Sequence, residues 1–529
     1  MVNKRRLKAL FFSVLFISCN SDIHIYENSV ISSPHPIASE TGKLIYSLGG
    51  NAFDAAVAAA FTLSVVEPSM SGIGGRLQAI YRKSDGLISG VDAMTQIPES
   101  FNNLDLDNLE SYGYKTIGIP GVVAGLLKLH EENGILDLET IMEPSIYIAE
   151  KGFIILPKAI KRMAGAKSEI EEFNGSKKYF LNKIGKPFEL GDKLIQKDLA
   201  NTLTLISKNG KSGFYEGEVA LKMVNDIKSN GGYISLEDLK NYQAIDSKVL
   251  TGEFNGYTAH SLYLPSYGAI TIQILQIMDY LDIKSKEQWP LKVASASEIA
   301  YMNRPFQNNK DSLKNILSLS KAKAIANGIN NHRFEISNSI DKDYSASNTA
   351  HLTTADKYGN VVSLTQTIGP IMGSKVSTDG LGFLYNVTMG PYLGGYLNEI
   401  NPGDRVSSNI SPTLFTKNNE VILALGAAGG NKIPTAITQV SYRYLKQKFN
   451  LNESLALPRV YKFNGPIQLE THLGVDRFYN NLDSDVYEIE KVPYEGEFGR
   501  IHAIALDSIN NKWIGSSDPD WEGTVKVFK

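Results

Sequence analysis

Residues 347–367 read S-N-T-A-H-L-T-T-A-D-K-Y-G-N-V-V-S-L-T-Q-T, two runs rich in β-branched residues on either side of the loop Lys357-Tyr358-Gly359. β-Branched residues favour strands, and a short glycine-containing loop between two such runs predicts a hairpin. Glycine in the last place of a three-residue loop suits a type I turn followed by a left-handed residue, because glycine enters that region without steric cost. The stretch therefore predicts two paired antiparallel strands.

The turn also predicts the register of the two strands. Pairing that is symmetric about Tyr358 places Leu352 opposite Leu364. The same register places Thr349 opposite Thr367, so that two hydroxyl groups meet at the open end of the hairpin. Taken by itself, a threonine pair across a ladder favours a packing and hydrogen-bonding role over a catalytic one.

Length and composition place the chain among large globular proteins. It has 529 residues, of which 43% are hydrophobic and 21% are charged, and its formal net charge is −3. This charge gives no basic field of the kind that attracts nucleic acid, so a nucleic-acid partner is not expected. The chain has a single cysteine and therefore no internal disulfide.

The first 18 residues look like an export signal. Basic residues precede a short apolar core, residues 9–17, which is too short to span a bilayer. Cys19 stands where such a signal would be cut, and the segment resembles a bacterial lipoprotein signal in which this cysteine becomes lipidated. We therefore expect residues 1–18 to be removed and the protein to be exported, lipid-anchored in the periplasm or cell envelope. A plain secretory peptide with an incidental cysteine is the alternative.

An alanine-rich helix is predicted after Asn51, a good N-cap, with Asp54 in the first turn, where negative charge is favoured. Pro68 bars its continuation. The glycine-rich loop that follows, residues 69–76, fits neither spacing of a phosphate-binding loop, so a nucleotide site is not predicted. The segment 310–344 is polar, and this composition predicts a mobile connection that ends just before Asn348.

Several motifs together resemble the γ-glutamyltranspeptidases. They are the hairpin that begins at Thr349, G-G-N-A-F-D-A-A-V-A-A-A at 49–60, E-P-S-M-S-G-I-G-G at 67–75, P-G-V-V-A-G at 120–125, R-V-S-S-N-I-S-P-T at 405–413 and G-A-A-G-G-N-K-I at 426–433. The resemblance implies an α+β fold of the amino-terminal-nucleophile hydrolase type, a four-layer αββα sandwich. It also implies a self-cleaving enzyme.

In that family the chain is cut before a threonine, here between Asn348 and Thr349. The resemblance thus implies a large fragment, residues 19–348, and a small fragment, residues 349–529, interdigitated as one domain. A threonine hydroxyl needs a neighbouring base, and the α-amine that the cut releases on Thr349 is one. Thr367 is then suited to orienting the nucleophile.

The remaining site residues follow from the other motifs. Gly429 and Gly430 match the glycine pair whose amides form the family's oxyanion hole. Ser408 and Asn409 match the serine pair that binds substrate, with asparagine replacing the second serine. No cofactor or metal is implied. A serine triad has no support, because no G-x-S-x-G motif occurs, and His351 is interpreted as structural.

The chain departs from the family where the substrate is held. Met94 occupies the place of the arginine that binds the γ-glutamyl carboxylate, and the run from Asn386 to Pro391 lacks both acidic residues that hold the amine. Arg76 replaces a glycine. Three hypotheses stay open: an enzyme that cleaves γ-glutamyl amides such as glutathione, with water or an amino acid or peptide as acceptor; an acylase for another amide; and a non-catalytic envelope lipoprotein that uses the fold for binding.

Overall fold

A computed structural model describes residues 25–101, 109–331, 348–391, 401–472 and 488–529. The predicted signal peptide, Cys19 and the segment just before Asn348 lie outside these residues. No helix in the part of the chain described here is both long and apolar enough to cross a membrane.

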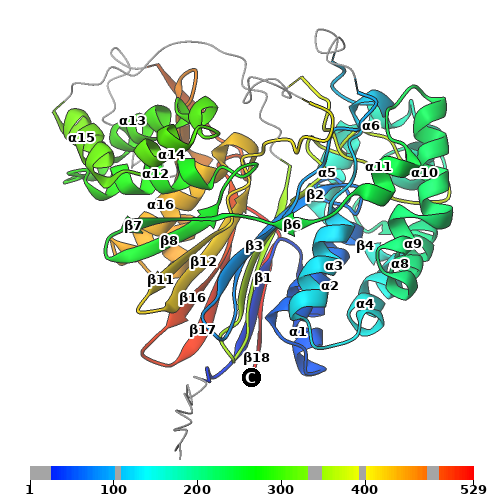
Figure 1. Ribbon diagram of the computed structural model, residues 1–529, viewed down its shortest axis with the longest axis horizontal. Coiled ribbons are helices and arrows are strands. Elements are labelled where there is room, and N and C mark those ends of the chain that lie inside the picture. Colours follow the sequence, from blue (N-terminus) through cyan, green and yellow to red (C-terminus); the bar gives the residue numbers. More distant parts are fainter. Residues whose placement is uncertain (1–24, 102–108, 332–347, 392–400, 473–487) are drawn as a thin grey trace, which may run out of the picture.

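The larger sheet has seven strands in the order β18-β1-β9-β10-β2-β3-β6, all antiparallel (Figure 1). Their bounds are β1 Ser29–Ser33, β2 Arg76–Arg82, β3 Ile88–Ala93, β6 Ile245–Asp246, β9 Ala350–Ala355, β10 Val361–Thr367 and β18 Thr524–Phe528. Strands β9 and β10 are the predicted hairpin, and they occupy the centre of this sheet.

The second sheet has six strands in the order β17-β16-β12-β11-β8-β7 and is also antiparallel. Its strands are β7 Val249–Phe254, β8 Tyr257–Leu262, β11 Thr413–Lys417, β12 Glu420–Ala428, β16 Arg500–Asp507 and β17 Lys512–Ser517. Two small sheets lie outside the sandwich, formed by β4 Phe153–Ile154 with β5 Lys193–Leu194, and by β13 Val460–Tyr461, β14 Ile467–Glu470 and β15 Ile489–Val492.

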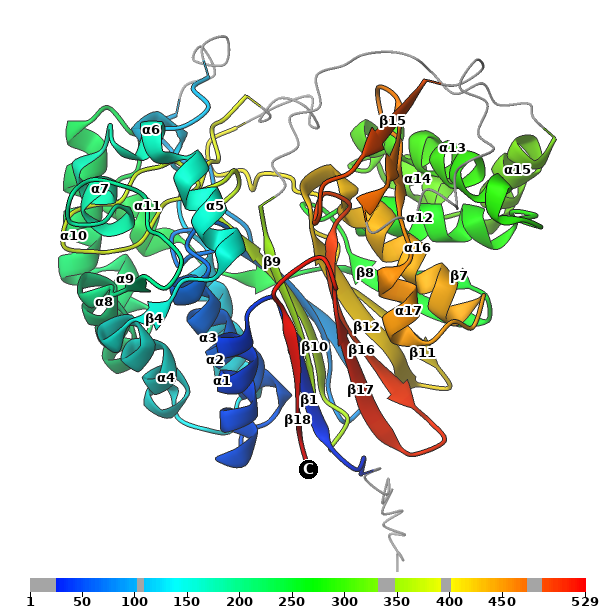
Figure 2. The same ribbon diagram turned by 180° about the vertical axis from the view of Figure 1, so that it is seen from behind.

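Helices cover the outer face of each sheet (Figures 1 and 2). On the larger sheet lie α1 Pro36–Ser47, α2 Ala52–Val66, α3 Val122–Asn133, α4 Leu138–Lys151, α5 Pro157–Gly165, α6 Lys167–Ile170, α7 Asn174–Phe180, α8 Lys197–Asn209, α9 Ser212–Tyr215, α10 Gly217–Ser229 and α11 Leu236–Asn241. On the second lie α12 Gly268–Asp279, α13 Trp289–Tyr301, α14 Lys310–Ile316, α15 Leu319–Asn330, α16 Ile433–Leu445 and α17 Leu451–Ala456. The four-layer αββα prediction is confirmed.

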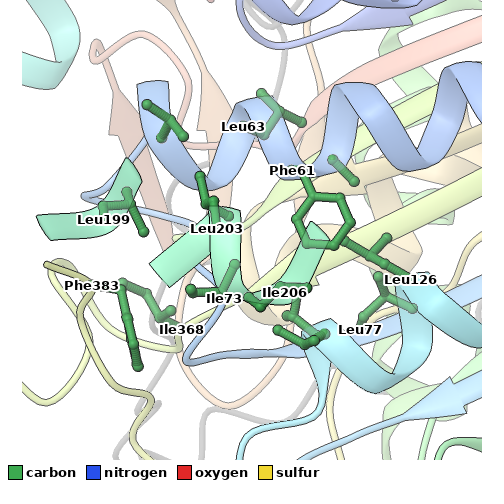
Figure 3. Packing of buried hydrophobic residues seen from close by; sticks show 14 of the residues in the cluster. Phe61, Leu63, Ile73, Leu77, Leu126, Leu199, Leu203, Ile206, Ile368 and Phe383 are labelled. Atoms are coloured by element: carbon green, nitrogen blue, oxygen red, sulfur yellow. The ribbon is translucent and has the colours of Figure 1, made fainter. Parts of the chain in front are cut away.

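The alanine-rich helix forms as predicted. Asn51 caps α2 by accepting from the amides of Phe53 and Asp54, and Asp54 accepts in return from the amide of Asn51. All of α2 is buried. Its Phe61 and Leu63 pack with residues of α3 and α8 against Leu77 of β2, which anchors the larger sheet on this helical layer (Figure 3).

One expectation is wrong. The segment 310–344 was predicted to be a connection, but its first part folds into α14 and α15. Leu313, Ile316, Ala322 and Ile325 recur at helical spacing and are buried against the second helical layer. The polar residues between them form the exposed face of these helices.

The hairpin has the predicted register. Leu352 pairs with Leu364, and the turn between the strands places Gly359 at φ 85°. Segments from the two predicted fragments alternate: β9 lies between β1 and β10, and β10 pairs in turn with β2. In the second sheet β11 likewise pairs with β8. Any cut before Thr349 would therefore leave strands of both fragments bonded to each other.

Candidate active site

Thr349 and Thr367 meet at the open end of the hairpin, as the register predicts. Thr349 immediately precedes β9, and Thr367 is the last residue of β10. The hydroxyl of Thr367 donates a hydrogen bond of 2.6 Å to the carbonyl oxygen of Asn348. The amide of Gly369 donates to the same hydroxyl at 3.0 Å. Because that amide occupies a lone pair of the hydroxyl oxygen, the hydroxyl proton is directed at the carbonyl of the bond predicted to be cut.

The face of the hairpin that carries Thr349 and Thr367 lies against the second sheet. Thr353, on the same face as Thr349, donates to the carbonyl of His502 on β16 at 2.8 Å. Ser363, on the same face as Thr367, donates to the carbonyl of Leu425 on β12 at 3.0 Å. The opposite face bonds the helical layer, where Thr354 donates to the carbonyl of Ala52. Thr349 therefore lies between the two sheets, and it is buried.

His351 lies near Thr349 in sequence, but both of its ring nitrogens are hydrogen-bonded to other residues. Its ring nitrogens contact two hydroxyls, Nδ1 with Thr365 at 2.8 Å and Nε2 with Thr353 at 3.0 Å. Since the Thr353 proton goes to His502, Nε2 carries the hydrogen and Nδ1 accepts from Thr365. Burial lowers the pKa of His351 to about 3. The ring is neutral with both nitrogens occupied, which agrees with the structural interpretation.

Gly429 and Gly430 follow β12 and turn the chain into α16. Their φ angles are 153° and 57°. A Cβ atom on Gly429 would lie 2.7 Å from Cα of Gly499. Both glycines have positive φ angles that other residues rarely adopt. A side chain on Gly429 would also clash with the backbone of Gly499.

The glycine pair lies at the same end of the sandwich as Thr349. The ring of His351 packs on Gly426 so closely that a Cβ there would lie 2.3 Å from the ring. From this contact β9 leads back two residues to Thr349, and β12 leads on three residues to Gly429. Ser363, which pairs with Thr353 on the turn side of His351, donates to the carbonyl of Leu425, the residue before Gly426. Both paths therefore lead away from the hairpin turn, and at about 3.3 Å per residue they cover comparable lengths.

Asn409 binds the glycine loop directly. Its Nδ2 donates to Oδ1 of Asn431, the residue after Gly430, at 2.5 Å. Its Oδ1 accepts from Nη2 of Arg304 at 2.6 Å. The amide of Ser408 donates to the carbonyl of Pro265 at 2.8 Å. The structure thus brings the predicted substrate-binding pair next to the predicted oxyanion loop.

Arg304 is a residue that sequence reasoning missed. It opens the short 3-10 helix Arg304–Phe306 and is 2% exposed. Its guanidinium lies over the rings of Tyr301 at 4.0 Å and Phe463 at 5.0 Å, where cation–π attraction stabilises a buried cation. Tyr301 also donates to the carbonyl of Asn431. Asn409 and Phe463 are distant from Arg304 in sequence, and no local pattern indicates these contacts.

The segments in which the chain departs from the family also converge. The hydroxyl of Thr388 donates to that of Thr95, next to Met94, at 2.6 Å. Arg405 reaches the same place but is engaged by Asp92, whose Oδ1 lies 3.1 Å from its Nη1. Burial raises the pKa of Asp92, and the Arg405 guanidinium opposes that rise. Arg405 is therefore part of a structural ion pair, and Met94 is buried and uncharged.

Comparisons with known proteins show the family and the fold of the chain. A family model described as gamma-glutamyltranspeptidase matches residues 38–528. A glutathione hydrolase proenzyme of Pseudomonas sp. (strain A14) is 32% identical over 470 residues, 82% of each chain. The acylase ACY 1 proenzyme of Pseudomonas sp. (strain SE83) is 29% identical over 481 residues, which cover 83% of this chain and 84% of that one. The crystal structure of cephalosporin acylase from Bacillus halodurans shares the fold, with a TM-score of 0.86, 24% identity and coverage of 98% and 99%.

Proposed function

We propose, from the premise that this chain belongs to the γ-glutamyltranspeptidase family, that it is a self-cleaving threonine amidohydrolase and acyltransferase. The acyl-enzyme would form on Thr349. One observation carries the proposal: the Thr367 hydroxyl donates to the Asn348 carbonyl oxygen at 2.6 Å, directly before the nucleophile. A hydrogen bond at this atom stabilises the negative charge that develops when the carbonyl is attacked.

This geometry supports self-cleavage in the following steps. The Thr349 hydroxyl oxygen attacks the Asn348 carbonyl carbon and forms a tetrahedral intermediate, whose oxyanion Thr367 stabilises. The bond from that carbon to the Thr349 nitrogen then breaks, and the hydroxyl proton is passed to the leaving amine. Water hydrolyses the resulting ester, which leaves a carboxylate on Asn348 and frees both the amine and the hydroxyl of Thr349.

Turnover would use the same hydroxyl with the new amine as its base. Thr349 attacks the amide carbonyl of a substrate, the amides of Gly429 and Gly430 hold the oxyanion, and the amine leaves after protonation. Water, or the amino group of an amino acid or peptide, then takes the acyl group from Thr349. Thr367 would orient the nucleophile, and Ser408 and Asn409 would line the acyl site.

For the substrate, γ-glutamyl amides such as glutathione are the first candidate, supported by a relative named glutathione hydrolase. A second candidate is an acylase acting on an amide that is not γ-glutamyl. It is favoured by the uncharged Met94 and by the run from Asn386 to Pro391, which offers no carboxylate for an ammonium group.

The test begins with denaturing electrophoresis of the purified protein. We expect two fragments divided before Thr349 in the wild type, and a single chain in Thr349→Ala. Thr349→Ser, which keeps a hydroxyl, should still be cut. An uncut wild type would refute the proposal and favour a non-catalytic binding role. Release of nitroaniline from γ-glutamyl and other acyl nitroanilides then separates the two substrate candidates.

We also propose that the protein is exported and anchored to a bacterial membrane through a lipid on Cys19, after removal of residues 1–18. The basic start, the short apolar core and the position of the cysteine support this. Labelled palmitate should be incorporated into the wild type and not into Cys19→Ala. Equal labelling of the two would refute the anchor.

A further inference from the structure

Glu470, His472 and Asp520 bring three potential metal ligands together. One ligand atom of each lies within 4.8 Å of the other two, and no other such group of three occurs among the residues that the structure describes. Glu470 is the last residue of β14, His472 lies two residues further on, and Asp520 lies in the connection from β17 to β18. The group therefore lies where the small sheet of β13, β14 and β15 meets the connection between the two large sheets.

Two atoms of this group lie opposite each other and have no hydrogen-bond partner in the described part of the chain. They are Oε1 of Glu470 and Nδ1 of His472, and they are 3.7 Å apart. A separation of this length is not a hydrogen bond. The Glu470 side chain is 4% exposed and that of His472 is 9% exposed. Because a buried polar atom without a partner is costly, a ligand that binds both atoms would be stabilising.

The remaining polar atoms of these two side chains are held by neighbouring residues. Oε2 of Glu470 accepts from the amide of Arg459 at 2.8 Å. Nε2 of His472 lies 2.6 Å from Oδ1 of Asp520, a distance at which the ring nitrogen donates to the carboxylate. With its hydrogen on Nε2, the neutral ring has a lone pair at Nδ1. A carboxylate on the far nitrogen is the usual group that sets the tautomer and the orientation of a metal-binding histidine.

The charges around the group favour a cation. Three carboxylates lie near one guanidinium, and they are those of Glu470, Asp518 and Asp520. The guanidinium is that of Arg459, and it pairs with Asp518 at 2.7 Å. Lys158 donates to the backbone carbonyl of Asp520, and its ammonium pairs with Glu495 at 2.9 Å. The described groups thus leave two buried negative charges beside a neutral imidazole, and a divalent cation would balance them.

Other buried histidines lack this combination. Nε2 of His35 and Nε2 of His502 also have no hydrogen-bond partner among the described residues. Neither ring belongs to a group of three potential ligands in that part of the chain. An unpartnered nitrogen is therefore not enough to single out His472. Its distinguishing feature is that an unpartnered carboxylate oxygen lies opposite that nitrogen while a second carboxylate holds the far side of the ring.

We propose that this group binds one divalent transition-metal ion, for which zinc is the model. Oε1 of Glu470 and Nδ1 of His472 are the ligands, Asp520 holds the ring through Nε2, and water completes the coordination. Bonds of about 2.1 Å to two atoms that are 3.7 Å apart give an angle of about 125° at the ion, near the tetrahedral value. An imidazole nitrogen with a carboxylate oxygen suits zinc, whereas calcium prefers a larger set of oxygen atoms.

The ion would stabilise the fold by linking the end of β14 to the connection between β17 and β18. All three residues lie after Thr349, so the site is contained in residues 349–529 whether or not the chain is cut. The inference therefore goes beyond the proposed enzymatic function and does not depend on it.

The first measurement is the metal content of the untagged, full-length protein after incubation with zinc chloride and dialysis. By plasma mass spectrometry, the wild type should retain about one zinc ion per chain. His472→Gln, which keeps a donor for Asp520 but loses the imidazole, should retain less than about a tenth of that amount, because even the loss of an outer partner of a ligand weakens binding by about 10-fold to 100-fold. Glu470→Gln, which keeps an acceptor for the Arg459 amide, should lose zinc to a similar extent.

The matched control is His130→Gln. The His130 side chain is 12% exposed and lies 3.8 Å from one carboxylate oxygen of Asp54. Its Nε2 contacts the carbonyl oxygen of Leu136 at 2.8 Å, and no second carboxylate holds its ring among the described residues. This variant should retain as much zinc as the wild type. Zinc bound at scattered surface positions would be retained equally by all variants.

Thermal unfolding of the wild type alone tests the inference even if the variants do not fold. After removal of metal with EDTA and dialysis, saturating zinc chloride should raise the melting temperature by roughly 2 °C or more, because an ion that binds only the folded state stabilises it. His472→Gln, where it folds, should show no such rise.

Two results would overturn the inference: zinc content that is equal in the wild type and His472→Gln, or a wild type that neither retains zinc nor gains stability from it. The second result would favour a protonated His472 between two carboxylates. An uncut wild type that retains zinc would overturn the proposed function and support the metal site, so the two failures are distinguishable.

Discussion

The Thr367 hydroxyl donates to the carbonyl oxygen of Asn348 at 2.6 Å, while its own oxygen accepts from the amide of Gly369 at 3.0 Å. Both hydrogen bonds of this hydroxyl are made within the chain, so its orientation is set before any substrate binds. It acts on the carbonyl of the chain itself, whereas the amides of Gly429 and Gly430 are proposed to act on the carbonyl of a substrate. The two reactions would therefore depend on different donors.

Replacing Thr367 by valine should slow self-cleavage. The variant keeps the shape of the side chain but loses the donor to Asn348, and removal of one oxyanion donor costs about 100-fold to 1000-fold in rate. The measurement is the time course of fragment appearance after synthesis. Thr367→Ser should cut nearly normally. Thr354→Val, which removes a hydroxyl from the opposite face of the hairpin, is the control, and equal slowing by that variant would contradict the assignment.

Replacing Gly429 by alanine should separate the two reactions. The new Cβ would lie 2.7 Å from Cα of Gly499, so the loop must shift and its amides with it. We expect cutting before Thr349 to proceed, and kcat for any hydrolysed amide to fall by about 100-fold. The control is Gly465→Ala, at a φ of 131° with no atom near the new Cβ. Normal turnover by Gly429→Ala would exclude this loop as the oxyanion site.

Replacing Asn409 by alanine should destabilise the protein and lower turnover. The change removes an acceptor from the buried Arg304 guanidinium and a donor to Asn431. Loss of a partner from a buried charged group costs about 1–3 kcal/mol, which thermal unfolding measures. Asn409→Ser, the residue that the family resemblance leads one to expect, should be intermediate. An unchanged melting temperature together with unchanged kcat/KM would show that the contact with Asn431 has no effect.

Lowering the pH should destabilise the fold partly through His351. Its pKa is about 3 in the folded chain and about 6.5 in an unfolded one. Between these values the unfolded state binds the extra proton, so this contribution is fully present above pH 6.5 and is lost as the pH falls toward 3. The free energy of unfolding should fall by about 1.4 kcal/mol per pH unit from this group.

His351→Gln should reduce that pH slope by one proton in denaturant titrations between pH 6.5 and 4. Because both ring nitrogens are occupied by threonine hydroxyls, we also expect self-cleavage to survive the change. An equal slope in wild type and variant would refute the assignment of the proton to His351. Loss of cutting in a folded variant would instead give this residue a direct role.

The sequence predicts those parts of the site that depend on residues close together in the chain. Gly359 and the strand residues around it determine the hairpin, and the hairpin places Thr367 beside Thr349 through a register that needs no other element. Asn51 and Asp54 likewise predict the start of α2, because a helix cap depends on residues within one turn.

What could not be predicted depends on contacts between distant segments. Arg304 reaches Asn409 across 105 positions, and Asn409 reaches Asn431 across 22. Arg76 is recognisable in the sequence only as a replaced glycine, and its place opposite Thr367 follows from the pairing of β2 with β10. The helices α14 and α15 were not predicted, because the polar composition of their exposed faces indicated a connection and only a short stripe of apolar residues has helical spacing.

Strands from before and after position 349 pair with each other, so a cut at this position changes the molecularity of the folding reaction. While the chain is whole, its folding is a unimolecular reaction with one product. Once the bond before Thr349 is cut, unfolding releases two chains, and refolding requires them to find each other, so the apparent stability of the cut protein depends on its concentration. A processed molecule that unfolds at high dilution would not readily reassemble, and its persistence would then be governed by the rate of unfolding.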